Sequence, residues 1–211
     1  WILDYALDPV YNRPLGFTPH AIAALEMNRF LSRSGITGSQ CAQVVVKNRR
    51  NARCNLLAAY PLDSDLAQVE SSPYLAYPLR EAELAKSADG CVVVVVANEA
   101  KARKAPSQPL WILGSGFATD SPTLESRDWS NAEYARLSAR AAYRQAGIKS
   151  PHEVDFFEVD DTYAYKELQH LIALGLYDKP AKAGHAIDAG ETRQDGKMPV
   201  NVSGGALGMG L

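Results

Sequence analysis

Residues 154–175 read VDFFEVDDTYAYKELQHLIALG, and this stretch decides the fold. Its first six residues, 154–159, are rich in branched and aromatic side chains and predict a strand. From residue 162 the apolar side chains recur at helical spacing until a glycine, which predicts a helix over 162–175. Asp160 and Asp161 therefore lie between a strand end and a helix start. In open α/β sheets, ligands bind at this position.

The two adjacent acids have two interpretations, which are compatible. Asp160 and Asp161 can repel each other, which raises one pKa and leaves a general acid or base near neutrality. An aspartate at a helix start can instead cap the helix by accepting orphan amide hydrogens. One acid can cap while the other faces a cavity, so both are candidate catalytic residues.

Two tyrosines follow in the first helical turn. Tyr165 shares the apolar stripe with Leu168 and is predicted to lie in the core. Tyr163 falls off that stripe, so it is the better functional candidate. Its phenol can act as an acid or orient a carbonyl when its surroundings lower its pKa.

A glycine-rich run, NVSGGALGMG, occupies residues 201–210. Glycines let backbone amides approach a ligand closely, and a thioester oxygen can accept from such amides. The candidate substrate-binding residues are Asn201, Ser203, Gly204 and Gly205. The run has neither the spacing nor the lysine of a phosphate loop.

The four histidines form no pair at helical spacing and no recognisable triad order. His185, in a segment that looks mobile, is the one we would test for ligand contact. His170 is expected on the surface or half-buried. No cluster has metal-type spacing, so no metal site is predicted.

Further strand and helix signals surround this stretch. Residues 91–97 contain five consecutive valines, typical of a strand buried on both faces of a layered α/β sheet. A short helix is predicted over 99–104, a linker over 105–109 and a second strand over 110–118.

A longer helix comes before the third strand. Ser130 and Glu133 predict a capping box for an alanine-rich helix that Gly147 ends. Together with the strand at 154–159, this order implies a βαβ unit.

The N-terminal part is predicted to be helical and then irregular. Thr18 and a following proline start a helix that Gly35 ends. Residues 37–55 mix strand and helix signals, and their length favours a helix. Residues 55–79 are predicted to be irregular.

Four cations, Lys47, Arg49, Arg50 and Arg53, follow one another within seven positions of the second helical segment. They are interpreted as a solvated helix face rather than a phosphate contact.

Composition limits the function classes. The 211 residues are 46% hydrophobic with a net charge of −2, which is ordinary globular composition without a positive field for nucleic acid. The longest apolar run, of about seven residues, is far shorter than a membrane span of roughly 20. Three cysteines leave no complete disulfide framework, which favours a reducing cytoplasm. Trp1 at the start and Leu211 directly after the glycine run indicate a chain that is cut at both ends.

Three ordered segments carry a family resemblance: SADGCVVVVVANEAKARK (87–104), VDFFEVDDTYAYKELQHLIALGL (154–176) and MPVNVSGGALGMG (198–210). Together they resemble the thiolase superfamily, in its lipid-transfer-protein or sterol-carrier-type branch. The resemblance implies an α/β fold with a layered α/β/α/β/α core, incomplete in this chain, and an irregular loop domain. Residues 1–84 would be the later part of the loop domain and 85–105 the last strand and helix of the N-terminal half. Residues 106–211 would be a truncated C-terminal half.

The family's usual catalytic side chains are missing. Many sterol-carrier-type thiolases read His-Asp-Cys-Phe where this chain has Asp160-Asp161-Thr162-Tyr163. A later Gly-His pair is replaced by Gly210-Leu211. The family's nucleophilic cysteine normally precedes this region and its second cysteine normally follows it.

These departures are similar to a branch of steroid side-chain aldolases, which cleave hydroxylated thioesters by retro-aldol chemistry. Retro-aldol cleavage needs a base for the hydroxyl proton and a donor for the enolate. Asp160 or Tyr163 would be the base, and the amides of Gly204 and Gly205 the donors.

The resemblance leaves three hypotheses. The first is retro-aldol cleavage of a steroid or lipid side-chain β-hydroxyacyl-CoA. The second is an acetyl-CoA acetyltransferase or 3-ketoacyl-CoA thiolase, and the third a non-catalytic scaffold subunit that binds acyl-CoA. A coenzyme A thioester would be substrate, with no covalently bound cofactor. Family analogy implies a homodimer and a small OB-fold/zinc-ribbon acyl-CoA-binding partner.

Overall fold

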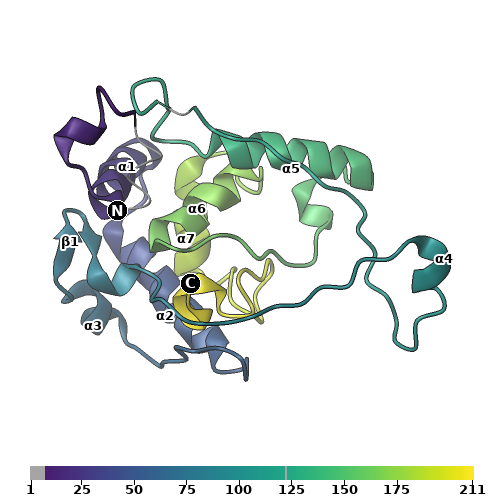
Figure 1. The fold of residues 1–211 in the computed structure, drawn as a ribbon. Coiled ribbons are helices and arrows are strands. Elements are labelled where there is room, and N and C mark those ends of the chain that lie inside the picture. Colours follow the sequence, from purple (N-terminus) through teal and green to yellow (C-terminus); the bar gives the residue numbers. More distant parts are fainter. Residues whose placement is uncertain (1–7, 122) are drawn as a thin grey trace.

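The computed structural model describes residues 8–121 and 123–211, and these are mostly helical (Figure 1). The first seven residues of the predicted loop domain and Pro122 lie outside the described residues. The helices are α1 (Pro19–Ser34), α2 (Gly38–Ala52), α3 (Leu66–Glu70), α4 (Glu99–Ala102), α5 (Glu133–Ala146), α6 (Ala164–Ala173), α7 (Pro180–Asp188) and α8 (Gly205–Met209). The strands are β1 (Tyr74–Ala76) and β2 (Leu79–Arg80), with 3₁₀ turns at Arg13–Leu15, Glu81–Glu83 and Pro151–Glu153.

Helices α1 and α2 confirm the two N-terminal predictions. The Thr18 hydroxyl caps α1 by accepting from the Ala21 amide at 3.2 Å, and Gly35 ends the helix in the left-handed region. Helix α2 starts with a capping box between Thr37 and Gln40. The branched side chains within α2 are buried by tertiary packing, which outweighs their preference for strands.

The predicted solvated face on α2 is wrong for two of its four cations. Lys47 and Arg49 are buried, whereas Arg50 and Arg53 are exposed and both contact Asp63. The buried cations have partners elsewhere in the chain, and burial without a partner would cost several kcal/mol.

The core forms where α1 and α2 pack on α6. Met27, Phe30, Val44, Tyr165 and Leu168 are fully buried in one cluster. Helix α2 also contacts α3, α7 and α8, so it lies at the centre of the described fold. The prediction that Tyr165 is a core residue is confirmed.

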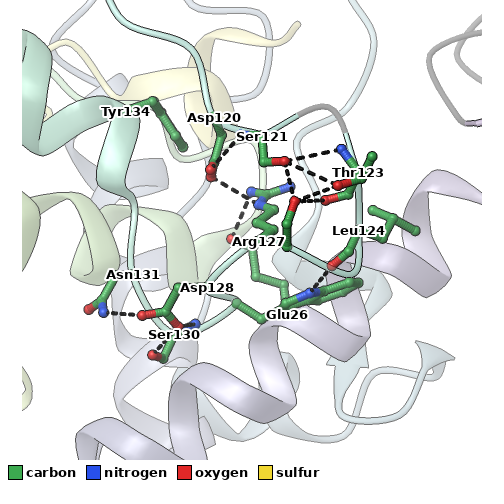
Figure 2. A network of polar contacts seen from close by, with 12 residues as sticks. Glu26, Asp120, Ser121, Thr123, Leu124, Arg127, Asp128, Ser130, Asn131 and Tyr134 are labelled. Atoms are coloured by element: carbon green, nitrogen blue, oxygen red, sulfur yellow. Dashed lines mark hydrogen bonds and ion pairs between the residues drawn. The ribbon is translucent and has the colours of Figure 1, made fainter.

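Residues 55–79 are irregular, as predicted, apart from α3 and the small antiparallel pair β1–β2. The capping box predicted at Ser130 is wrong. Helix α5 has Ala132 as its N-cap, and the Ser130 hydroxyl donates to Asp128 instead (Figure 2). Gly147 ends α5 as predicted, in the left-handed conformation.

The strands predicted over 91–97 and 110–118 are absent from the described residues. Val92–Val96 are 75–88% exposed, and Leu110 is 98% exposed. We call residues 91–113 the projecting arm, because they run away from the helical body to α4 and back (Figure 1). A strand needs a neighbour for its backbone hydrogen bonds, and the described chain offers none there. The short helix predicted near residue 99 is confirmed as α4.

The third predicted strand is reduced to one parallel bridge between Phe157 and Val200. The βαβ unit is therefore not formed in the described chain. The bridge still fixes residues 157–160 beside the glycine-rich loop, because the Phe157 amide donates to Pro199 and the Asn201 amide to Phe157. This pairing brings Asp160, Asp161 and the loop together.

Candidate active site

The start of α6 carries the three predicted catalytic residues. Asp160 is exposed and forms a local turn, in which its Oδ1 accepts from the Thr162 amide at 2.9 Å and hydroxyl at 2.6 Å. It therefore does not cap α6, whose N-cap is Tyr163 without a side-chain cap. Asp160 is the one acid of the pair that remains accessible.

Tyr163 is partly buried and lies against His20 from the first turn of α1. The phenol oxygen is 3.2 Å from His20 Nδ1, and the rings meet edge to face. Burial, with the Asp160 and Glu26 carboxylates, raises the pKa of Tyr163. The lowered pKa considered for this phenol is therefore wrong. A neutral phenol next to an imidazole is suited to relaying a proton.

Asp161 is fully buried and holds α8 in place. Its carboxylate accepts from the amides of Ala206 at 2.5 Å and Leu207 at 3.3 Å, and from the Asn48 side chain at 2.7 Å. Burial and the Glu167 carboxylate raise the pKa of Asp161 to about 7. The capping interpretation thus applies to Asp161, but for α8 rather than for α6.

A buried polar network extends from Asp161 to α2. Glu167 pairs with Lys47 at 3.0 Å and accepts from the Asn48 and Asn201 amides at 2.7 and 2.8 Å. Lys47 also donates to the Val200 carbonyl at 2.9 Å. These bonds join α2, α6 and the glycine-rich loop, and satisfy charges that burial would otherwise destabilise.

A second cluster of charged residues lies at the phenol of Tyr165. Glu26 of α1 accepts from the Tyr165 phenol at 3.1 Å and pairs with Lys166 at 2.6 Å and Arg127 at 3.2 Å. Arg127 also reaches Asp120 at 3.1 Å, as Figure 2 shows. The loop before α5 is thereby tied to α1.

His170 is buried, so the prediction of a surface or half-buried position is wrong. Its Nδ1 lies 3.2 Å from the Asp160 carbonyl, which can only accept, so Nδ1 carries the proton. Its Nε2, 2.7 Å from the Tyr134 phenol, is then the acceptor. Burial, with Lys166, lowers the pKa of His170. His170, Tyr134 and Asp160 line a groove of about 310 Å³.

The predicted substrate-binding residues differ in whether their polar groups are already hydrogen-bonded within the protein. Asn201 and Ser203 are committed within the protein, since the side-chain oxygen of Asn201 accepts from the Val159 amide and Ser203 donates to Glu158. The Gly204 amide donates to the Asn201 carbonyl at 3.0 Å, so it is not available to an enolate.

The other two predicted contacts differ in setting. Gly205 is buried directly beside Asp161. His185 is exposed and lies within α7 rather than in a mobile segment. Their contact with substrate remains a prediction.

The sequence did not connect His20, Glu26 or Arg127 with this site. They lie more than 100 residues from Tyr163, Lys166 and Glu26 respectively. The one available signal was Glu26, a charged residue on an otherwise apolar face of α1. Within residues 8–121 and 123–211, no group of three or more histidine, cysteine or acidic side chains could hold a metal ion. No helix of this part of the chain is long and apolar enough to cross a membrane.

Comparison with known proteins identifies a similar family. Residues 116–210 match the family model described as thiolase C-terminal domain-like. The chain is 30% identical over 206 residues to an acetyl-CoA acetyltransferase of Methanothermobacter thermautotrophicus, covering 97% of this chain and 53% of that protein. It is 28% identical to a 17-hydroxy-3-oxo-4-pregnene-20-carboxyl-CoA lyase of Mycobacterium tuberculosis, covering 96% and 54%.

The fold is similar to a solved structure described as an Ltp2-ChsH2(DUF35) aldolase. The TM-score is 0.82 at 24% identity, over 93% of this chain and 53% of that chain. The chain thus spans about half the length of the relatives that it matches. The thiolase-like fold class is confirmed, although the strands predicted over 91–97 and 110–118 are not formed in the described residues.

Proposed function

Since residues 116–210 belong to the thiolase C-terminal domain-like family and the chain has a thiolase-like fold, we propose that the protein acts on a carbon–carbon bond of an acyl-CoA thioester. The favoured reaction is retro-aldol cleavage of a lipid or steroid side-chain β-hydroxyacyl-CoA. The similarity to a lyase that is named for a carboxyl-CoA substrate supports this choice. No covalently bound cofactor is required, because the thioester itself accepts the electrons.

The observation that carries the proposal is the contact between Tyr163 and His20 beside the exposed Asp160. Both residues are only partly buried. The raised pKa of Tyr163 keeps its phenol neutral, so it can accept a proton only while passing its own to a neighbour. His20 Nδ1 is that neighbour.

The proposed reaction has three steps: proton transfer, bond cleavage and protonation of the enolate carbon. The substrate β-hydroxyl gives its proton to the Tyr163 oxygen, while the phenol proton moves to His20 Nδ1. The Cα–Cβ bond breaks, its electrons form the thioester enolate, and the former hydroxyl carbon becomes a ketone or aldehyde. The enolate carbon then takes a proton back through the same relay.

The enolate oxygen needs a donor. The loop amides of Gly204, Ala206 and Leu207 are already engaged within the protein. Gly205 therefore remains the proposed donor of the glycine-rich loop.

Thiolysis is the alternative, and its support is the acetyl-CoA acetyltransferase that is 30% identical. The two reactions are separated with the full-length protein, a β-hydroxyacyl-CoA, and a β-ketoacyl-CoA with free CoA. Release of a ketone or aldehyde without CoA consumption supports retro-aldol cleavage. Cleavage that occurs only with free CoA would replace it by thiolysis.

Variants test the relay. Tyr163→Phe and His20→Gln should each lower kcat at least about 100-fold while KM changes little, because they remove proton transfer rather than binding. His152→Asn is the matched control, since His152 is exposed at a distant turn. Unchanged turnover in both relay variants would rule the relay out. Acyl-CoA binding without turnover in the native protein would leave the scaffold hypothesis.

The proposal includes two protein partners. A homodimer is expected by analogy with the family. The similar aldolase structure is a complex of two components, Ltp2 and ChsH2, which supports a protein partner for this chain; that this partner is a small acyl-CoA-binding protein is part of the proposal. Light scattering of the purified protein, alone and with a candidate partner, measures both.

A further inference from the structure

A cavity of about 680 Å³ lies between α2, α3, α7 and the turn at residues 193–195. It is more than twice as large as the groove beside Asp160, about 310 Å³. Small-molecule sites are typically about 300–1,000 Å³. The cavity therefore has the size of a ligand site, and neither Asp160 nor Tyr163 lines it.

One face of α2 forms the cavity wall. Gln43, Val46 and Arg50 recur at three- and four-residue intervals along that face, and Cys54 follows just beyond the end of the helix. Val46 shares the wall with two further apolar side chains, Leu66 and Ile187. The cavity therefore offers an apolar surface next to polar groups.

The cations that line the cavity are not equally available. Lys47 is paired with Glu167 at 3.0 Å, and Arg50 with Asp63 at 3.2 Å. Arg193, in contrast, has no carboxylate partner among residues 8–121 and 123–211. Asp195 is the one acidic side chain that lines the cavity within the same ranges. Because Lys47 and Arg50 are paired with carboxylates, Arg193 is the cation of the lining whose guanidinium has no such partner among the described residues.

From this arrangement we infer a second ligand site, which takes an organic carboxylate with an apolar body. The planar guanidinium of Arg193 matches the two oxygens of a carboxylate. The hydrocarbon body lies against Val46, Leu66 and Ile187, where burying it removes apolar surface from water. The site is independent of the proposed acyl-CoA reaction, because it shares no residue with the Tyr163–His20 pair.

Ligand binding in the cavity can be measured through the rate at which the cysteines are alkylated. Cys54 is exposed and lines the cavity, Cys91 is exposed in the projecting arm, and Cys41 is buried. The full chain is treated with iodoacetamide, an uncharged reagent, with and without decanoate. Alkylation of each cysteine is followed by peptide mass spectrometry. Decanoate should slow alkylation of Cys54 saturably and leave Cys91 unchanged, so Cys91 is an internal control.

Two arginine variants separate the cavity from the general surface charge. Arg193→Gln should raise the decanoate concentration for half-protection about tenfold, since it removes a charge-assisted pair. Arg53→Gln should leave it unchanged, because Arg53 is exposed at the end of α2 and does not line the cavity.

Three results would overturn the inference. If decanoate slowed alkylation of Cys54 and Cys91 equally, or slowed neither, a site at this cavity would be excluded. Equal protection by uncharged decanamide would exclude recognition of the carboxylate. Equal protection by inorganic phosphate would reduce the cavity to a simple anion site without a role for its apolar wall.

Discussion

Replacement of Gly205 by alanine tests the coupling between the glycine-rich loop and Asp161. Gly205 has a φ of +58°, a left-handed conformation that costs an ordinary residue about 1–2 kcal/mol. A methyl group there would also stand 2.6 Å from the Asp161 carboxyl carbon. The carboxylate would have to move away from the Ala206 amide and the Asn48 side chain.

The magnitude follows from these two effects. Hydrogen bonds to charged groups contribute about 1.5–3 kcal/mol each, so loss of one or two adds about 1.5–6 kcal/mol to the strain. Gly205→Ala should therefore lower the free energy of unfolding by about 3–8 kcal/mol. Gly147→Ala is the matched control: its φ is +73°, and a Cβ there meets nothing within 4 Å. That variant should lose only about 1–2 kcal/mol, from the strain alone.

The assay is urea denaturation of the purified protein, followed by far-ultraviolet circular dichroism and linear extrapolation to water. The difference between the two glycine variants isolates the contact with Asp161. Equal losses for Gly205→Ala and Gly147→Ala would refute the reasoning, because the carboxylate would then not be confined by the loop.

Three more predictions concern the buried charges. Lys47→Met should cost about 3–5 kcal/mol of stability in urea denaturation, because the buried Glu167 would lose its partner; Lys101→Met, on the exposed α4, should change the stability by less than about 0.5 kcal/mol. Burial raises the pKa of Asp161 from 3.8 to about 7, so the native state holds its proton more tightly than the unfolded state. The stability that this proton contributes is present below about pH 4 and is lost as the pH rises through about 7, a change on the order of 4 kcal/mol. Asp161→Asn should remove this pH dependence of the free energy of unfolding, measured by urea denaturation at a series of pH values. The same pH dependence in the variant would contradict the prediction. Arg127→Gln should speed proteolytic cleavage of the loop before α5, since it removes both ion pairs of that loop; cleavage at the native rate would mean that other contacts hold the loop.

Local chemistry explains why some elements could be predicted from the sequence. Thr18 and Gly35 bound α1, and Gly147 ends α5, because caps act within one turn of the helix. The apolar spacing in α6 correctly placed Tyr165 in the core. The three quoted motifs were enough to indicate the thiolase-like fold, which the comparisons confirm.

The strand predictions failed for a non-local reason. The valine run at 91–97 has the composition of a buried strand, but a sheet depends on a neighbouring strand as well as on the segment itself. Of the three predicted strands, only the one at 154–159 has such a neighbour in the described residues, through the pairing of residues 157 and 200.

The sequence by itself determined helices α1, α2, α4, α5 and α6, the family resemblance and the position of Asp160, Asp161 and Tyr163 at the start of α6. The tertiary structure decided what these residues do: Asp161 is buried to cap α8, whereas Tyr163 lies against His20, 143 positions away in the chain. It also turned Lys47 from an expected surface cation into the buried partner of Glu167. Caps and periodicity are properties of neighbouring residues, but charge pairing and burial depend on which distant segments pack together.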